Sequence, residues 1–445
     1  MKADSKRIYY FIGIGGVGMS ALARLCLKDG YSVYGYDKIS SEITDQLIKK
    51  GINIIFDNTV SALNELLLST EVQIIYSAAI PKSHPQLEFY KKQGNNVSKR
   101  AEFLAKICNN KKTLAVAGTH GKTTTSSILT HIFYKSNKSF TSIMGGFFNN
   151  NLSNLIKTGS ESIIVEADEY DRSFLHLNPT FACITSMEAD HLDIYKTQDV
   201  YEDAFFQFSK QVTGKLIVAH GLPISGLTYG IEVPADYKGY NVQIIKNGYR
   251  FDLKTPNGNF KNIFFNQIGI HNLCNAIGAI AMADQAGINM NKALLALKSF
   301  PGVYRRMNLY RWRDAYIIDD YAHHPSEINS VFEAIKDFYP KQKNCVVFQP
   351  HLYSRTRDFM NDFKTVLNKF DEVKIIDIYP ARENPIEGVN VKTLLEGISN
   401  KKAKYIQKNQ VKNELKKSDA TIFALLGAGD IGEEIKQFKN EFVIT

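Results

Sequence analysis

The chain of 445 residues is 44% hydrophobic and 22% charged, and it carries a formal net charge of +9. This composition is typical of a globular protein, and the length predicts about three domains. The basic residues are scattered, as in an ordinary lysine-rich protein, and match no nucleic-acid-binding motif, so we expect no nucleic-acid partner. No apolar run of 18 residues, no signal-peptide cleavage site and no paired cysteine spacing occurs, so we expect a reduced cytoplasmic protein without a membrane partner.

The first elements along the chain form a predicted β-α-β unit around a glycine-rich loop. An apolar strand at 8–12 precedes Gly13-Ile-Gly-Gly-Val-Gly18, and a helix at 19–28 and a strand at 31–36 follow. Asp37 comes next, so the unit matches the fingerprint of a dinucleotide-binding fold. Such a loop offers a helix N-terminus to an anion, and a diphosphate other than NAD fits it equally well.

A second copy of this glycine pattern weakens the dinucleotide interpretation. Gly427-Ala-Gly-Asp-Ile-Gly432 follows a predicted strand at 421–426. One protein seldom binds two nicotinamides, so at least one of the two loops must have another role. The first domain continues through a strand at 72–77 and a turn at 79–85, and we place its end at residue 108.

The most specific motif of the chain is Gly118-Thr-His-Gly-Lys-Thr-Thr124, between an apolar strand at 114–117 and a helix at 123–134. The turn's backbone N–H groups and the helix dipole form a cradle for phosphate oxygens. Lys122 would reach the terminal phosphates and the Thr123 hydroxyl would face Mg2+, although only two residues separate the glycines where the usual P-loop has four. The motif predicts a nucleoside-triphosphate site.

Acidic residues follow the next strands of this central domain. Glu166 ends a strand at 162–165, and His191 lies among carboxylates after a strand at 181–186. Because the carboxyl ends of neighbouring parallel strands meet at one edge, both residues are candidate metal ligands. Residues 224–268 predict a small antiparallel β insertion with Asn-Gly turns, and a helix after Gly269 closes the domain near residue 304.

A third α/β unit is predicted over residues 305–445. Its strands at 315–318, 345–348, 372–378 and 421–426 each end in polar, charged or glycine-rich residues. Open α/β sheets bind ligands at that edge, so these four strand ends predict part of a binding site.

With these motifs in this order, the chain resembles the Mur ligases of peptidoglycan synthesis over essentially its whole length. The motifs that carry the resemblance are Gly13–Gly18, Gly118–Thr125, Glu166–Glu169, Glu188–Asp193, Gly269–Asn272, Gly302–Arg306, Asp319–Pro325, Phe348–His351 and Gly427–Asp430. The resemblance implies an α/β protein of three domains: N-terminal Rossmann-like (1–108), central P-loop ATPase-like (109–304) and C-terminal Rossmann-like (305–445).

The resemblance also implies a reaction. The first domain would hold UDP-N-acetylmuramate, with its glycine loop on the diphosphate, and the central domain would hold ATP with Mg2+. ATP would phosphorylate the lactyl carboxylate, and the amine of L-alanine, brought by the third domain, would attack the acyl phosphate. The sequence does not decide between a monomer and a homodimer.

The resemblance assigns roles to residues at matching positions. Those implied to be catalytic are Lys122, Glu166, His191, His323 and Arg355, and those implied to hold the metal are Thr123, Glu166 and His191. Those implied to bind ATP are Gly118, Thr119, His120, Gly121, Lys122, Thr123, Thr124, His271, Asn272, Arg306 and Asp319. Those implied to bind the other substrates are Gly13, Gly15, Gly16, Val17, Gly18, Asp37, Ser77, His84, Tyr321, His351 and Arg355.

The chain departs from the family pattern at two positions. Leu352 stands where relatives commonly have Arg, so that anion contact is either missing or supplied by Arg355 or Arg357. Tyr36 stands where a small residue is usual, which leaves the contact on the uracil side open. Later Mur ligases carry a carbamylated lysine where this chain has Phe206.

Three alternatives remain at this stage: a ligase that attaches a recycled tripeptide, an NAD-dependent dehydrogenase, and a non-catalytic P-loop switch. The compact segment 174–179 favours the alanine-adding activity over the tripeptide ligase. A dehydrogenase would leave the phosphate loop without a role, and a switch would leave the polar edge of the third domain unexplained.

Overall fold

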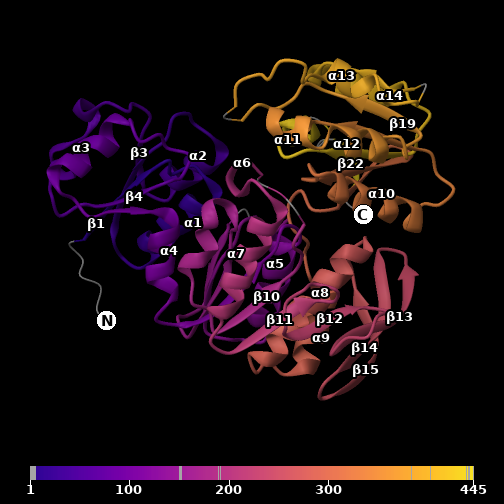
Figure 1. Ribbon diagram of the computed structural model, residues 1–445, viewed down its shortest axis with the longest axis horizontal. Coiled ribbons are helices and arrows are strands. Elements are labelled where there is room, and N and C mark those ends of the chain that lie inside the picture. Colours follow the sequence, from indigo (N-terminus) through magenta and orange to yellow (C-terminus); the bar gives the residue numbers. More distant parts are fainter. Residues whose placement is uncertain are drawn as a thin grey trace. The chain divides into compact units, whose positions relative to one another are not determined.

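The computed structural model describes residues 7–149, 153–188, 190, 192–381, 383–400, 402–436, 438 and 441–443. The chain divides into two compact units. The first contains Met1–Lys238 and Ala276–Ala296, and the second contains Gly239–Asn275 and Leu297–Thr445. Figure 1 shows the helices and strands that alternate along the chain. Within the described residues, no helix has the length and apolar character needed to cross a membrane.

The first unit begins with a parallel five-stranded sheet in the order β3-β2-β1-β4-β5. Its strands are β1 (Ile8–Ile12), β2 (Ser32–Tyr36), β3 (Asn53–Ile55), β4 (Gln73–Tyr76) and β5 (Val97–Lys99). Its helices are α1 (Val17–Lys28), α2 (Glu42–Lys49), α3 (Pro85–Gln93) and α4 (Arg100–Cys108), with 3-10 turns at Val60–Ala62 and Glu65–Leu68. This is the predicted Rossmann-like arrangement.

The central strand β1 is buried on both faces, as its continuous apolar sequence predicts. Tyr10 and Ile12 pack into the core on one face, whereas Tyr9 and Phe11 pack into the core on the other. The second of these cores continues into the next sheet of the unit, where it includes Ala115. The two sheets of the first unit therefore share apolar packing.

The second sheet of this unit carries the phosphate loop. Its strands follow the order β12-β11-β10-β6-β9-β7-β8 and are β6 (Lys112–Ala117), β7 (Phe140–Ile143), β8 (Leu155–Lys157), β9 (Ser162–Glu166), β10 (Phe181–Ile184), β11 (Lys215–Ala219) and β12 (Leu227–Ile231). The helices α5 (Lys122–Lys135), α6 (Leu192–Tyr195) and α7 (Gln198–Lys210) and a 3-10 segment at Tyr170–His176 complete it. Because β9 and β10 run parallel to β6 on its two sides, their carboxyl ends lie beside the phosphate loop.

One part of the predicted antiparallel insertion is wrong. Strand β12, inside the predicted range 224–268, pairs in parallel with β11 and extends the main sheet. An alternating strand pattern gives no information on which neighbour or direction it will pair with. The later part is confirmed, since β14 (Gly248–Thr255) and β15 (Gly258–Phe265) form an antiparallel hairpin at the predicted Asn257-Gly258 turn.

The second unit contains β14 and β15 and a seven-stranded sheet in the order β20-β19-β18-β21-β17-β16-β22. The strands of this sheet are β16 (Asn308–Trp312), β17 (Ala315–Asp320), β18 (Asn344–Phe348), β19 (Glu372–Ile375), β20 (Lys404–Tyr405), β21 (Ile422–Leu426) and β22 (Phe442–Val443). Strands β17 to β21 run parallel to one another. Strand β16 pairs antiparallel with β17 on one side and with β22 on the other. The four predicted strand ends therefore share one edge.

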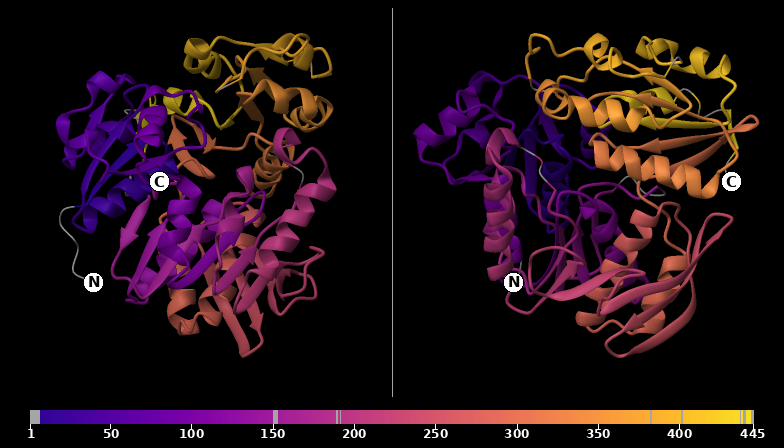
Figure 2. Two further views of the ribbon diagram at one scale, coloured as in Figure 1. Left: turned by 60° about the vertical axis from the view of Figure 1, so that its left-hand side comes forward. Right: turned by 45° about the vertical axis from the view of Figure 1, so that its right-hand side comes forward.

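Helices cover both faces of this sheet (Figure 2). The core on one face contains α10 (Pro325–Phe338), α12 (Met360–Leu367) and α13 (Val391–Leu395). The core on the other contains α14 (Val411–Lys416) and α15 (Ile431–Lys436). Shorter elements are α11 (Tyr353–Asp358) and a 3-10 turn at Lys408–Gln410, and α8 (Ile270–Gln285), α9 (Met290–Lys298) and β13 (Tyr237–Ile245) contain residues of both units.

Candidate active site

The phosphate loop between β6 and α5 has a backbone that requires glycine at two positions. Gly118 and Gly121 have φ angles of +136° and +83°. A Cβ at Gly118 would also lie 2.1 Å from Thr185 Oγ1, so no side chain fits there. The loop leads into α5 at Lys122, and the first-turn N–H groups of a helix have no carbonyl partner within the helix. The predicted anion cradle is therefore formed.

The loop is held by residues at the end of β10. The backbone N–H of His120 donates to Ser186 Oγ at 2.8 Å, and that of Thr119 donates to Ser186 O at 3.2 Å. The Thr119 hydroxyl donates to Glu188 O at 2.7 Å. Ser186 belongs to none of the motifs in the sequence, because a serine after a strand carries no distinctive pattern.

Lys122 forms an ion pair with a buried carboxylate, Glu169. Its Nζ donates to Glu169 Oε1 at 2.9 Å, and it also donates to the carbonyl oxygens of Gly118 and Thr119 at 2.5 and 3.1 Å. Burial raises the pKa of Glu169 to about 7, against the opposing charge of Lys122. Burial disfavours the Lys122 ammonium, but the nearby carboxylates, Glu169 first, outweigh this and raise its pKa. Glu169 lies within the acidic motif but was not predicted as a site residue.

Thr123 and Glu166 are brought together as the predicted metal ligands. Thr123 Oγ1 lies 3.0 Å from Glu166 Oε1, and Glu166 Oε2 accepts from the Gly145 N–H at 3.0 Å. Adjacent ligands of an octahedral Mg2+ with bonds of about 2.0–2.1 Å lie roughly 2.9 Å apart. The Thr123 hydroxyl donates to Glu166 in this contact, and the two oxygens lie close enough together to contact one ion. His191, the third predicted ligand, lies outside the described residues.

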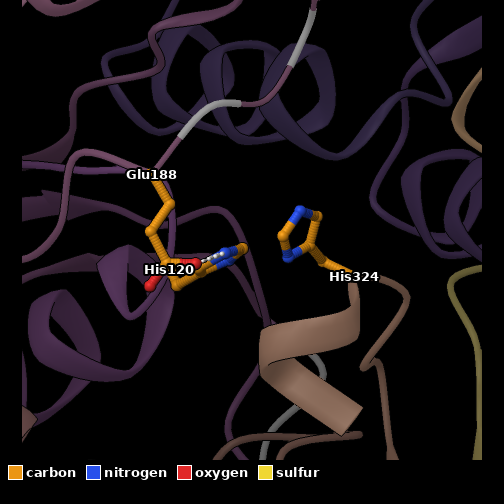
Figure 3. A group of neighbouring side chains, drawn as sticks. All are labelled: His120, Glu188 and His324. Carbon is orange, nitrogen blue, oxygen red and sulfur yellow. Dashed lines mark ion pairs between the residues drawn. The ribbon is translucent and has the colours of Figure 1, made fainter. Parts of the chain in front are cut away.

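His120 contributes a second polar contact beside the loop. Its Nε2 lies 3.4 Å from Glu188 Oε2, and Figure 3 shows this ion pair as a dashed line. His324, drawn in the same picture, belongs to the second unit, where it caps α10. Thr124, also predicted to bind ATP, is 7% exposed in the first turn of α5.

The N-terminal glycine loop is hydrogen-bonded to Asp37, the acidic residue that follows β2. The Gly15 N–H donates to Asp37 Oδ2 at 2.7 Å, and the Lys38 N–H donates to Asp37 Oδ1 at 2.8 Å. Gly13 has a φ of +86°, and its Cβ would lie 3.2 Å from Ser77 Cβ, so the predicted residues of this loop lie close together. Both Asp37 oxygens are thus engaged by backbone, whereas the carboxylate of a dinucleotide site serves the ribose.

Tyr36, one of the departures from the family pattern, packs on a predicted substrate residue. Its ring centroid lies 4.8 Å from that of His84. The His84 side chain is buried, neither ring nitrogen has a hydrogen-bond partner among the described residues, and burial lowers its pKa. A neutral imidazole with open nitrogens beside an aromatic ring suits a polar ligand with a flat face.

The second unit contains the other residues predicted for the nucleotide. His271 and Asn272 lie in the first turn of α8, and the Asn272 amide donates to Ile268 O at 2.9 Å. Burial lowers the pKa of His271 to about 4, so its ring is neutral at pH 7. Its Nδ1 is buried without a partner among the described residues.

Asp319 and Arg306, both predicted to contact the nucleotide, have different partners within the second unit. Arg305 Nε donates to Asp319 Oδ1 at 3.1 Å, and burial raises the pKa of Asp319 to about 6 against the Arg305 charge. Arg306 Nη1 lies 3.8 Å from Glu327 Oε1, and its guanidinium lies 5.2 Å from the centroid of the Tyr321 ring. The sequence motif contains both arginines, and only the fold distinguishes them.

Four predicted residues gather at the polar edge of the seven-stranded sheet. The rings of Tyr321 and His323 lie 5.4 Å apart, and those of His323 and His351 lie 5.7 Å apart. Arg355 Nη1 lies 3.5 Å from His351 Nδ1, and the Arg355 side chain is buried. Two imidazoles, a phenol and a guanidinium therefore form one cluster that can bind an anion and hold a proton.

Leu352 shows how the chain accommodates its second departure. It adopts a φ of +71°, which is a strained backbone for a branched residue, and it precedes α11. Arg355 lies on the first turn of that helix and reaches back to His351. Arg357 instead pairs with Asp358 at 2.7 Å. Of the two arginines, Arg355 is therefore the one that lies beside His351.

The second glycine loop, 427–432, is filled by the protein itself. Gln349 Oε1 accepts from the Ile431 N–H at 2.9 Å, and Gln349 Nε2 donates to Asp430 Oδ1 at 2.7 Å. Arg305 donates to Gly427 O and, at 3.1 Å, to Gly429 O. This copy of the pattern therefore connects parts of the second unit by hydrogen bonds within the protein.

Comparison with known proteins agrees with this geometry. Three family models match in order: the catalytic domain of the Mur ligase family at 8–112, the Mur ligase middle domain at 116–283, and the Mur ligase glutamate ligase domain at 305–431. A UDP-N-acetylmuramate–L-alanine ligase of Flavobacterium psychrophilum is 47% identical over 435 residues, which cover 97% of each chain. One of Christiangramia forsetii is 46% identical over 436 residues, covering 97% of this chain and 96% of the relative.

Solved structures are similar over the same length. The crystal structure of a UDP-N-acetylmuramate–alanine ligase from Thermotoga maritima superposes with a TM-score of 0.82 at 26% identity and covers 98% of both chains. A murein peptide ligase from Psychrobacter arcticus, with a TM-score of 0.69 at 21% identity and 98% of both chains covered, shares the fold. The α/β architecture, the order of the motifs and these matches lead to one assignment: the chain belongs to the Mur ligase family.

Proposed function

We propose that this protein joins L-alanine to the lactyl carboxylate of UDP-N-acetylmuramate at the expense of ATP, giving ADP and phosphate. The observation that carries the proposal is the phosphate loop, with Lys122 seated in it and Thr123 beside Glu166. Near-full-length relatives named for this reaction support it. We retain the domain limits 1–108, 109–304 and 305–445, with UDP-N-acetylmuramate, ATP and alanine assigned to them in that order.

In the first step, a carboxylate oxygen attacks the γ-phosphorus of ATP and ADP leaves. Such a transfer needs positioning and charge neutralisation more than covalent help. The N–H groups at the start of α5 hold the phosphates, and Lys122 places a positive charge on them. Glu169 orients the Lys122 ammonium within the loop, so its charge is positioned beside the phosphates that we propose to bind there.

A bound Mg2+ would neutralise the charge that develops on the transferring group. Thr123 and Glu166 would hold it, with His191 as a further proposed ligand. The Gly145 N–H fixes the second Glu166 oxygen, so the carboxylate is oriented before any ion binds.

In the second step, the amine of alanine attacks the acyl phosphate and phosphate leaves. The cluster of Tyr321, His323, His351 and Arg355 suits this step, since a guanidinium can hold a carboxylate or phosphate and an imidazole can accept the amine proton. His271, Asn272, Arg306 and Asp319 are proposed contacts of the nucleotide. We propose the cytoplasm as the location, where ATP is available and cysteines stay reduced.

The test is phosphate release by the full chain with UDP-N-acetylmuramate and ATP, scanned over amino acids and the L-Ala-D-Glu-diaminopimelate tripeptide. We expect release that requires both UDP-N-acetylmuramate and L-alanine. Serine and glycine in the same scan measure how strictly alanine is chosen. Full activity with the tripeptide and none with alanine would move the assignment to the recycling ligase.

A further inference from the structure

Arg100, the first residue of α4, lies against the N-terminal glycine loop. A Cβ on Gly18 would lie 3.1 Å from Arg100 Nη1 and 3.2 Å from its Cδ. The missing side chain of Gly18 therefore makes room for the arginine. Gly18 lies in the first turn of α1, so the guanidinium lies beside the start of that helix, where the first N–H groups have no carbonyl partner within the helix.

The other side of the same guanidinium is held by the acidic loop of the second sheet. Arg100 Nη2 donates to Asp168 Oδ2 at 2.9 Å. Asp168 is the neighbour of Glu169, which pairs with Lys122 at the phosphate loop. Adjacent carboxylates thus hold one cation at each of the two glycine loops of the first unit.

Arg100 has donors to spare for a ligand. A guanidinium carries five N–H donors, and among the described residues Asp168 is the acceptor that it contacts. Its side chain keeps 23% of its exposure, so it is oriented but still accessible. The segment Gly13–Gly18 contains no basic residue, in contrast to the phosphate loop with Lys122.

We propose that Arg100 binds the diphosphate of UDP-N-acetylmuramate at Gly13–Gly18, and that Asp168 is the positioning residue that aims it. The inference rests on the proposed function. A guanidinium suits this ligand, because its planar fork matches two phosphate oxygens. Arg100 supplies the cation that the first glycine loop itself lacks.

The chain offers a matched control beside Arg100. Lys99 Nζ pairs with Asp171 Oδ2 at 3.0 Å, which also links the N-terminal sheet to the acidic segment, but both side chains are about 40% exposed, at 43% and 42%. Exposed ion pairs contribute little to stability. Lys99→Ala thus removes a neighbouring positive charge and a contact between the same segments, without touching Gly18.

The experiment compares wild type, Arg100→Ala, Arg100→Lys and Lys99→Ala in steady-state kinetics. Arg100→Ala should raise the KM for UDP-N-acetylmuramate about tenfold or more, because a charge-assisted hydrogen bond to phosphate is lost, while the KM for ATP stays within about twofold. Arg100→Lys should recover part of the loss, and Lys99→Ala should behave as wild type.

A binding measurement separates this role from a structural one. Wild type should bind UDP more tightly than UMP in calorimetry, and Arg100→Ala should lose most of that preference while it keeps its melting temperature. An unchanged KM for UDP-N-acetylmuramate in Arg100→Ala, or equal changes in both KM values in Arg100→Ala and Lys99→Ala, would overturn the inference. The two proposals can fail separately. If the wild-type protein does not use alanine but still binds UDP more tightly than UMP, and loses that preference in Arg100→Ala, only the proposed reaction is contradicted.

Discussion

Lys122 and Glu169 show how one buried ion pair prepares a loop for an anion. The Lys122 side chain is 14% exposed and that of Glu169 is 2% exposed, so neither charge is well hydrated. A buried charge that loses its partner is costly, so the pair holds Lys122 within the loop. The ammonium is therefore positioned for the phosphate contact that we propose.

Replacing Lys122 by alanine should lower turnover by roughly 10²-fold or more, since a preorganised charge on the transferring phosphoryl group is lost. The affinity for UDP-N-acetylmuramate, placed on the N-terminal sheet, should change little. Turnover and calorimetric binding measure the two effects. Lys135→Ala, at the other end of α5, is the control.

The Lys122→Ala variant also leaves Glu169 buried without its cation. The double variant Lys122→Ala/Glu169→Gln removes that charge, and its melting temperature and turnover show whether a loss of activity comes from the loop itself. Wild-type turnover in either variant would refute the role of the loop in ATP binding.

The buried His131, in the middle of α5, should lower the free energy of unfolding of the protein in acid. Burial, followed by the charge of Lys135, lowers its pKa from an ordinary 6.5 to about 4. Between these values the unfolded chain binds a proton that the folded chain does not, so the free energy of unfolding falls as pH drops below about 6.5. At pH 5 this amounts to about 2 kcal/mol.

His131→Gln should therefore narrow the difference in free energy of unfolding between pH 7.5 and pH 5.0, measured by urea titration. His220→Gln removes an exposed histidine and serves as the control, with the difference expected to match wild type. Equal acid sensitivity in His131→Gln and wild type would show that this residue is not the source.

At the scale of elements, α7 is the helix of the central sheet in which later Mur ligases carry a carbamylated lysine. Its buried face consists of Tyr201, Ala204, Phe205 and Phe208, and the Tyr201 hydroxyl lies 2.7 Å from Thr119 Oγ1. The residue that reaches the phosphate loop is thus an aromatic one, and Phe206 packs against the core. The only lysine of α7, Lys210, lies at its last position.

The absence of a suitable lysine from α7 predicts that activity does not depend on dissolved CO2. Where later Mur ligases carry a lysine carbamate, Glu166 and the nucleotide phosphates would balance the metal charge here. The assay uses degassed, bicarbonate-free buffer, to which bicarbonate is then added. A several-fold recovery of the rate would contradict this expectation.

The loop between β1 and α1 makes a further prediction at this scale. Both oxygens of Asp37 accept backbone N–H groups, so the carboxylate is oriented by the loop itself, whereas in a dinucleotide site it is directed at the ribose. We expect no detectable binding of NAD or NADP in a calorimetric titration, with UDP as the positive control. Micromolar affinity for NAD would reopen the dehydrogenase hypothesis.

At the scale of the molecule, the first unit is joined across its two sheets by a buried polar contact. Arg24 Nη1 on α1 donates to Asn154 Oδ1 before β8 at 2.5 Å, and Arg24 Nη2 donates to Gln46 Oε1 at 3.0 Å. The Asn154 amide donates to Val17 O and Ser20 Oγ at 2.5 and 3.2 Å. These contacts fix the helix that follows the N-terminal glycine loop.

Arg24→Ala should lower the free energy of unfolding by about 3 kcal/mol, because the buried Asn154 oxygen loses a charge-assisted donor. Chemical denaturation measures the change. Lys92→Ala, which removes an ion pair with Glu88 in which the lysine side chain is 82% exposed, should cost less than about 0.5 kcal/mol. Equal losses of unfolding free energy in the two variants would mean that the contacts of Arg24 contribute no more to stability than an exposed ion pair.

Much of the fold follows from local patterns in the sequence. The strand before Gly13, the strand and helix around Gly118–Lys122, and the four polar strand ends of the third sheet were predicted from apolar runs and glycine positions, and the structure confirms them. These features depend on backbone geometry within a few residues, which composition and spacing encode directly.

Partners distant in the sequence could not be predicted this way. Three contacts depend on which strands lie side by side: the bond of Lys122 to Glu169, that of Arg305 to Asp319, and that of the phosphate loop to Ser186. The parallel pairing of β12 with β11 is of the same kind, because a strand's own residues do not specify its neighbour.

The two glycine loops illustrate the distinction most directly. Gly13–Gly18 and Gly427–Gly432 share one local pattern, and each precedes a helix. The tertiary structure gives them different roles: Gln349, at the end of another strand, occupies the second loop and accepts the Ile431 N–H, whereas the first has Arg100 beside Gly18. Glycine spacing sets the backbone turn, but what can enter the turn depends on side chains from distant strands, whose positions only the packed sheet defines.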